Sequence, residues 1–152
     1  MRQDKAEKYL SLARHQASLF SKDPSTQVGA LLLAPQSLQI LSMGYNGFPR
    51  GINETIAERW ERPTKYLYAE HAERNAIYNA ARRGTPLEGA ICVVTLFPCA
   101  DCARALIQSG ISRLVCPQPD MNHDRWGAHF EVSLKLLEEA QVQLQWVKEN
   151  GQ

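Results

Sequence analysis

A dense apolar run that leads into Pro98-Cys99-Ala100-Asp101-Cys102 restricts the fold of this 152-residue chain more than any other feature. The run from Ala90 to Leu96 predicts a buried strand. Proline is favoured at the beginning of a helix and glycine just after its end, so we expect a helix from about Cys99 to Ser109, closed by Gly110. Two thiols three residues apart then share one face of that helix, at its positively polarised end. A strand, a tight turn and a helix that carries a cysteine pair are therefore expected here.

Helical and extended segments alternate along the rest of the chain. Further helices are expected at about 5–20, 70–83 and 128–140, and further strands at 28–33, 39–43, 113–116 and 142–147. The first two strands predict a hairpin, residues 44–51 form a loop, and residues 52–63 are ambiguous between a loop and a short helix. Strands that alternate with helices after a hairpin indicate an α/β fold whose sheet has helices on both faces.

Length and composition favour a single domain that spans residues 1–152. The hydrophobic fraction of 44% and the charged fraction of 22% are ordinary for a globular protein. A net charge of +1 argues against nucleic acid as a partner, because binding to polyanions rewards a basic surface. No apolar run has the length of a membrane span and no secretory pattern opens the chain, so we expect a cytoplasmic protein that does not enter a membrane. In a reducing compartment, close cysteines are more often metal ligands or catalytic groups than disulfides.

The triplet His71-Ala72-Glu73 supplies the groups that would complete a catalytic zinc site. His71 begins a predicted helix and can add a third ligand to Cys99 and Cys102, whereas structural zinc sites close all four positions with protein. Zinc lowers the pKa of its bound water to near 7, and Glu73 could move the proton of that water to a ring nitrogen and to a leaving amine. H-x-E followed by P-C-x-x-C is the signature of zinc deaminases that act on nucleobases. A structural zinc site or a chance pairing is the alternative, and the missing fourth ligand argues against it.

Four stretches of the chain resemble the cytidine/deoxycytidylate deaminase superfamily, and most closely its deoxycytidylate (dCMP) branch. They are SKDPSTQVGA (21–30), GYNGFPRG (44–51), TKYLYAEHAERNAI (64–77) and LFPCADCARALIQSGI (96–111). The resemblance implies a three-layer α/β/α fold with a mixed five-stranded sheet, and hydrolysis of dCMP to dUMP and ammonia. It also implies a homo-oligomer, a hexamer or a dimer, and regulation by dCTP and dTTP.

The resemblance also implies roles for individual residues. The family's zinc ligands map to His71, Cys99 and Cys102, with one ion per chain, and its proton shuttle maps to Glu73. Substrate contacts map to Asn46 and Gly47 of the GYNG loop for the sugar, the Ala72 backbone for the base carbonyl and Phe97 for a wall of the base site. Gly44 to Gly47 could instead bind the effector. Glu70 departs from the apolar or small residue that is usual before the ligand histidine, so it could contact the zinc ligands or select another base or sugar.

The residue that holds the 5′-phosphate is left open by the sequence. Arg50, Arg74 and Arg104 are candidates because a guanidinium binds phosphate through two hydrogen bonds, with Arg50 the first choice and Lys22 and Lys65 weaker. A solvated surface charge is the alternative for each of them. Three other functions also remain open: a deaminase of another small nucleoside or free base, a tRNA adenosine deaminase, and a zinc domain without catalysis. The near-neutral charge argues against tRNA, and the presence of Glu73 argues against an inactive domain.

Overall fold

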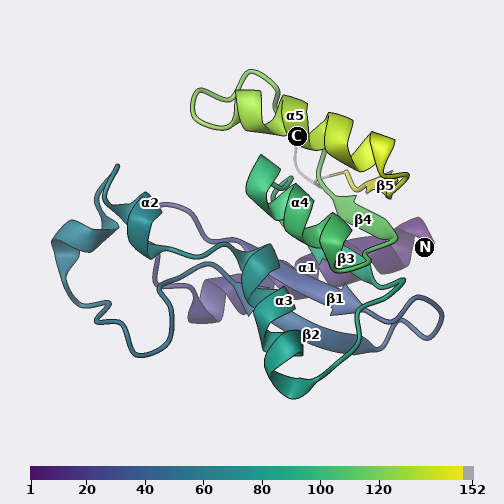
Figure 1. Ribbon diagram of the computed structural model, residues 1–152, viewed down its shortest axis with the longest axis horizontal. Helices are drawn as coiled ribbons and strands as arrows, with labels where there is room; N and C mark the ends of the chain where they lie inside the picture. Colours follow the sequence, from purple (N-terminus) through teal and green to yellow (C-terminus); the bar gives the residue numbers. More distant parts are fainter. Residues whose placement is uncertain (149–152) are drawn as a thin grey trace.

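One mixed five-stranded sheet organises the chain (Figure 1). The computed structural model describes residues 1–148. Its strands are β1 (Gly29–Leu33), β2 (Ile40–Tyr45), β3 (Ile91–Val94), β4 (Arg113–Cys116) and β5 (Gln143–Trp146). They lie in the order β2-β1-β3-β4-β5, with β1 antiparallel to both of its neighbours and β3, β4 and β5 parallel to one another. The mixed sheet that the resemblance implies is therefore confirmed.

Helices cover both faces of this sheet and complete the three layers. The helices are α1 (Gln3–Phe20), α2 (Lys65–Tyr68), α3 (Ala72–Arg83), α4 (Ala100–Gln108) and α5 (Gly127–Glu139), with a 3₁₀ turn, η1 (Ala57–Trp60). Helix α1 packs on one face, while α3, α4 and α5 pack on the other (Figure 1). Alternate residues of β1 supply the two cores, since Leu31 and Leu33 join the α1 side and Ala30 and Leu32 the opposite side. Among residues 1–148, no helix is both long and apolar enough to cross a membrane.

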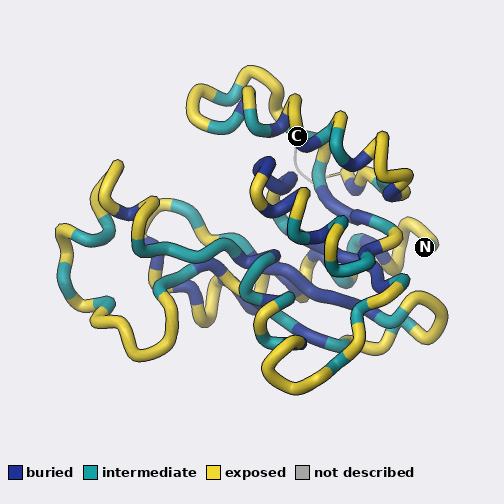
Figure 2. Tube along the Cα trace, viewed as in Figure 1, coloured by how far each residue is buried: buried dark blue, intermediate teal, exposed yellow. Residues whose placement is uncertain are grey.

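The sequence prediction was least informative between β2 and α3. The ambiguous segment 52–63 contains η1, and the single turn of α2 was not expected. One helical turn is too short to produce a recognisable apolar period. This stretch projects from the sheet at the left of Figure 1, and Figure 2 shows that most of it is exposed or only partly buried. The central strands β1 and β3 are, by contrast, buried along their whole length (Figure 2).

Helix α3 lies in close contact with strand β2 at Gly44. A Cβ atom on Gly44 would lie 2.3 Å from the carbonyl oxygen of Ala72 and 2.4 Å from the backbone nitrogen of Ala76. Ala72 and Ala76 are themselves completely buried, so small side chains on both elements permit the approach. The contact therefore fixes the position of the first turn of α3, which follows His71.

We expect Gly44→Ala to destabilise the protein by about 1–3 kcal/mol, because the added methyl group would force α3 away from the sheet. Urea unfolding followed by circular dichroism measures the loss. Gly47→Ala is the matched control, since a Cβ there would meet no atom within 4 Å. Neither glycine has a positive φ, so the pair isolates the steric effect. Equal stability of the two variants would show that α3 can move without cost.

Candidate active site

The beginnings of helices α3 and α4 converge on one cluster of three side chains. His71 and Cys99 are the N-cap residues of the two helices, both with extended backbone, and Cys102 lies in the first turn of α4. The Nδ1 atom of His71 lies 3.4 Å from the Sγ atom of Cys99 and 3.4 Å from that of Cys102. Within the described chain, this is the one group of at least three His, Cys, Asp or Glu residues whose ligand atoms all lie within 4.8 Å of one another.

The cluster has the dimensions of a zinc site. Zinc–nitrogen bonds of about 2.1 Å and zinc–sulfur bonds of about 2.3 Å at tetrahedral angles place nitrogen and sulfur roughly 3.6 Å apart. The two observed separations of 3.4 Å are close to that value. Zinc is therefore the cofactor, and His71, Cys99 and Cys102, the ligands that the sequence predicts, are placed so that they could hold it. Three protein ligands would leave a fourth position for water or substrate.

The two thiols of the cluster differ in acidity when no cation is bound. Two hydrogen bonds, the one from Cys102 with the larger effect and the one from His71 with the smaller, lower the pKa of Cys99 to about 4. The same hydrogen bond to Cys99, together with burial, raises the pKa of Cys102. The cluster therefore holds one thiolate and one thiol at neutral pH, and binding of a divalent cation releases the second proton.

Glu73 lies beside the cluster, in the first turn of α3. Its side chain is buried, with 4% of the residue exposed, and burial raises the pKa of its carboxyl group above the usual value. A buried carboxyl group with a raised pKa can accept and release a proton nearer to neutral pH. The geometry therefore suits the proton shuttle that the sequence predicts for this residue.

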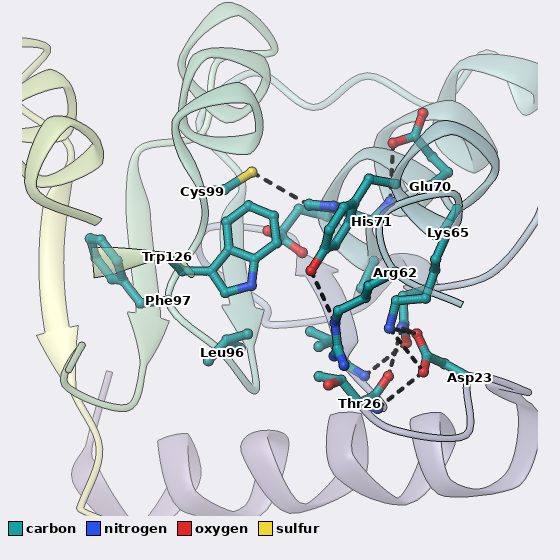
Figure 3. A pocket seen from close by; sticks show the side chains of 16 residues that line it. Asp23, Thr26, Arg62, Lys65, Glu70, His71, Leu96, Phe97, Cys99 and Trp126 are labelled. Carbon is teal, nitrogen blue, oxygen red and sulfur yellow. Dashed lines mark hydrogen bonds and ion pairs between the residues drawn. The ribbon is translucent and has the colours of Figure 1, made fainter. Parts of the chain in front are cut away.

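A pocket opens over the cluster and connects it to the surface (Figure 3). His71, Glu73 and Cys99 contribute to its lining. The other lining residues include Asp23, Thr26, Val28, Asn46, Arg62, Lys65, Tyr66, Glu70, Ala72, Leu96, Phe97 and Trp126. The ring of Trp126 meets the rings of both His71 and Tyr66 edge to face, with centroids 5.9 and 5.8 Å apart. Aromatic rings thus form one wall next to the metal ligands.

Three of the predicted substrate residues, Asn46, Ala72 and Phe97, line this pocket. Ala72 is the first residue of α3, so its N–H has no acceptor within the helix and can serve a ligand. Phe97 is 2% exposed and contacts Phe130 edge to face, so it presents only a small part of its ring. The substrate contacts of these residues stay predictions.

The side-chain amide of Asn46 is already engaged in the protein. Its oxygen accepts hydrogen bonds from the Ser21 hydroxyl and the Val28 N–H, and its nitrogen donates to the Thr26 carbonyl. A weaker contact of 3.4 Å joins the same nitrogen to Asp23. An amide makes about four hydrogen bonds, so a contact with the sugar would have to replace one of these.

Gly47 and Arg50 are not among the residues that line the pocket. Gly47 forms a backbone bridge with Glu70, with N–O distances of 3.1 and 2.8 Å. The guanidinium of Arg50 is exposed and donates to the side-chain oxygen of Asn79 at 2.6 Å. Their proposed substrate contacts therefore have no support from the geometry of the pocket.

Glu70, the unusual residue before the ligand histidine, supports the beginning of α3. Its Oε1 atom accepts hydrogen bonds from the His71 backbone N–H at 3.0 Å and from the Arg74 Nε atom at 2.6 Å. A carboxylate at a helix N-terminus is favoured by the helix dipole. Glu70 therefore contacts the backbone of His71, an expected zinc ligand. It also forms an ion pair with Arg74, one of the candidates for binding the phosphate.

The sequence did not single out two pocket residues, Arg62 and Trp126. Arg62 lies in the stretch whose structure was ambiguous, and Trp126 lies in the loop before α5. Neither belongs to a motif, and each reaches the pocket only because the chain folds back over the two helix N-termini. No local signal in the sequence could have found them.

The fold and the site define a zinc-dependent hydrolytic deaminase. The family model described as "Cytidine and deoxycytidylate deaminase zinc-binding region" matches residues 3–118, and the chain belongs to this family. An uncharacterized deaminase of Aliivibrio fischeri is 43% identical over 129 residues, which cover 84% of each chain. A probable deoxycytidylate deaminase of Caenorhabditis elegans is 39% identical over 142 residues, which cover 91% of this chain and 67% of that protein.

A solved structure has the same fold. The dCMP deaminase of cyanophage S-TIM5, crystallised with dCMP and dUMP, aligns with a TM-score of 0.76 over 97% of this chain and 99% of that one. The sequences are 22% identical, so this likeness concerns the arrangement of helices and strands.

In metal-free protein, we expect iodoacetamide to alkylate Cys99 at a rate that stays high down to about pH 5, because its pKa of about 4 keeps it a thiolate. Cys92 and Cys116 should not react in the folded protein, since both are buried and burial raises the pKa of each. Peptide mass spectrometry identifies the labelled residue. Zinc should protect Cys99, and equal labelling with and without zinc would exclude it as a ligand.

Proposed function

We propose that this deaminase hydrolyses dCMP to dUMP and ammonia. The observation that carries the proposal is the buried carboxyl group of Glu73 beside the cluster of His71, Cys99 and Cys102, where the pocket begins. The choice of nucleotide is supported by the deoxycytidylate deaminase name of the Caenorhabditis elegans relative and by dCMP and dUMP in the phage crystal structure.

The residues of the pocket divide the reaction between them. When bound, zinc supplies an activated water at neutral pH. Glu73 takes the first proton of the attacking water and delivers it to the ring nitrogen. It then carries the second proton of the same water to the amine, which leaves as ammonia while the carbonyl forms. The Ala72 N–H donates to the carbonyl oxygen of the base, since the first turn of a helix leaves this donor free. Trp126 and Phe97 exclude bulk water from the reacting end of the pocket.

Purified, zinc-loaded protein should deaminate dCMP with a kcat/KM well above that for deoxycytidine, because the phosphate adds a charged contact. Ammonia release and the ultraviolet change of the base measure turnover with dCMP, CMP, deoxycytidine, cytosine, adenosine and guanine in parallel. Turnover of a nucleoside or a free base without turnover of dCMP would agree with zinc-dependent deamination but would show that dCMP is not the substrate. No turnover of any of them would refute the proposed function.

Glu73→Gln and Cys102→Ala should both lose deaminase activity, but for different reasons. Glu73→Gln removes the proton carrier but no ligand, so it should retain zinc and lose about 10²- to 10⁴-fold in kcat. Cys102→Ala removes a ligand, so it should lose zinc as well as activity. Metal analysis of the two purified variants, alongside their kinetics, separates these outcomes. Loss of zinc from Glu73→Gln would instead make Glu73 a ligand.

We also propose that the protein is a homo-oligomer, a dimer or a hexamer, that dCTP or dTTP regulates it, and that it is cytoplasmic. An apolar patch supports the first statement, since Leu19 and Phe20 are 62% and 54% exposed and Phe20 stacks on exposed Tyr45 with ring centroids 5.8 Å apart. Regulation rests on the family resemblance, and the compartment rests on the close cysteines, which in a reducing environment are more often metal ligands than disulfides. Light scattering of the purified protein, with and without dCTP, tests the assembly and its response to the nucleotide.

A further inference from the structure

Arg62, one of the cations that line the pocket, pairs with no carboxylate among the residues that the structure describes. Lys65 also lines the pocket, but its Nζ atom lies 2.9 Å from the Asp23 carboxylate and both side chains are buried. Burial opposes the ionisation of Asp23, but hydrogen bonds from the Ser25 backbone and from Lys65 outweigh it and lower the pKa of Asp23. The charge of Lys65 is therefore already balanced within the protein.

Glu70, another acidic residue of the lining, is balanced as well. Its Oε1 atom lies 2.6 Å from the Nε atom of Arg74. Glu73 also lines the pocket, and the proposed function assigns it the proton transfer. Among the arginines and lysines that line the pocket within residues 1–148, the exposed guanidinium of Arg62 is thus the one without a carboxylate partner. An anionic ligand would balance it.

Two neutral hydroxyl groups hold Arg62 in place. Its Nε atom donates to the Tyr66 hydroxyl at 3.0 Å, and its Nη2 atom donates to the Ser25 hydroxyl oxygen at 3.1 Å. A guanidinium has five N–H donors, so about three stay free, including both on Nη1. Figure 3 shows Arg62 near Asp23 and Lys65, on the side of the pocket away from Cys99. The free donors therefore lie apart from the reacting end.

We propose that Arg62 binds the 5′-phosphate of the substrate and makes the enzyme select a nucleotide over a nucleoside. This inference rests on the proposed function, because a base whose amino group reaches the zinc cluster needs its phosphate held elsewhere in the same pocket. The planar guanidinium can donate two parallel hydrogen bonds to a phosphate, and Tyr66 and Ser25 orient it before the nucleotide arrives.

The other basic residues that could bind phosphate are engaged elsewhere. Arg50 is bonded to Asn79, Arg104 to Asp101, and Lys22 to Glu54. None of these three basic residues lines the pocket. Arg62 is therefore the lining residue best suited to recognise a phosphate.

The test compares the substrate preference of Arg62→Gln with that of the unaltered enzyme. Removing a charged hydrogen-bond donor from a phosphate costs about 10- to 100-fold in binding. The ratio of kcat/KM for dCMP to that for deoxycytidine should fall by this factor, mostly through KM for dCMP. Arg62→Lys should restore part of the ratio, because it returns the charge without the fork geometry.

Arg59→Gln is the matched control from the same projecting segment. Arg59 is half-buried, lies over the ring of Tyr68 at 4.7 Å from its centroid and does not line the pocket, so the substrate ratio should stay unchanged. Tyr66→Phe removes one hydroxyl that orients Arg62, and it should lower the ratio by less than Arg62→Gln. Zinc content and thermal midpoint of each variant confirm that the fold is intact.

A binding measurement separates the two ways in which this inference can fail. Calorimetry with zinc-loaded protein should show that dUMP binds more tightly than deoxyuridine, and that Arg62→Gln removes the difference. If the unaltered enzyme processes dCMP and binds dUMP but Arg62→Gln retains the full preference, the assignment of Arg62 is wrong and the proposed function stands. If the unaltered enzyme neither turns over dCMP nor binds dUMP, both are wrong.

Discussion

The close contact between helix α3 and strand β2 is the constraint on which the site depends. Gly44 leaves no room for a side chain against Ala72 and Ala76, so the first turn of α3 has one position on the sheet. His71 precedes that turn and Glu73 lies in it, and Cys99 precedes the first turn of α4. A metal site needs its donor atoms placed within a few tenths of an ångström, and rigid packing of helices on a sheet provides this precision.

Charge is distributed in this pocket by pairing within the protein. Asp23 and Lys65, which both line the pocket, balance each other, and Glu70 is balanced by Arg74 at the N-terminus of α3. Buried charges are tolerated only when they are paired and hydrogen-bonded. The groups without a partner of opposite charge are then the ones available to a ligand: the buried acid at the reacting end and the guanidinium at the other.

The sequence predicted the parts of the molecule that depend on local patterns. The order of the elements, the hairpin and the metal ligands follow from apolar runs, from helix signals at Pro98 and Gly110, and from the spacing of Cys99 and Cys102. The lining of the pocket could not be predicted in the same way. Arg62 and Trp126 reach it from segments with no period and no motif, and whether Asn46 has a free amide depends on contacts between distant residues.

The stretch between β2 and α3 lies largely outside the helix-covered sheet (Figure 1). The expected zinc ligands Cys99 and Cys102 are, by contrast, buried at the beginning of α4. The residue proposed to bind the phosphate and the residues proposed to carry out the hydrolysis consequently belong to separate parts of the chain. Surface segments accept insertions and substitutions more readily than packed elements do. A lineage could therefore exchange this one stretch for another of different length and change which group beyond the base the enzyme recognises, while the residues that carry out the hydrolysis are inherited unchanged.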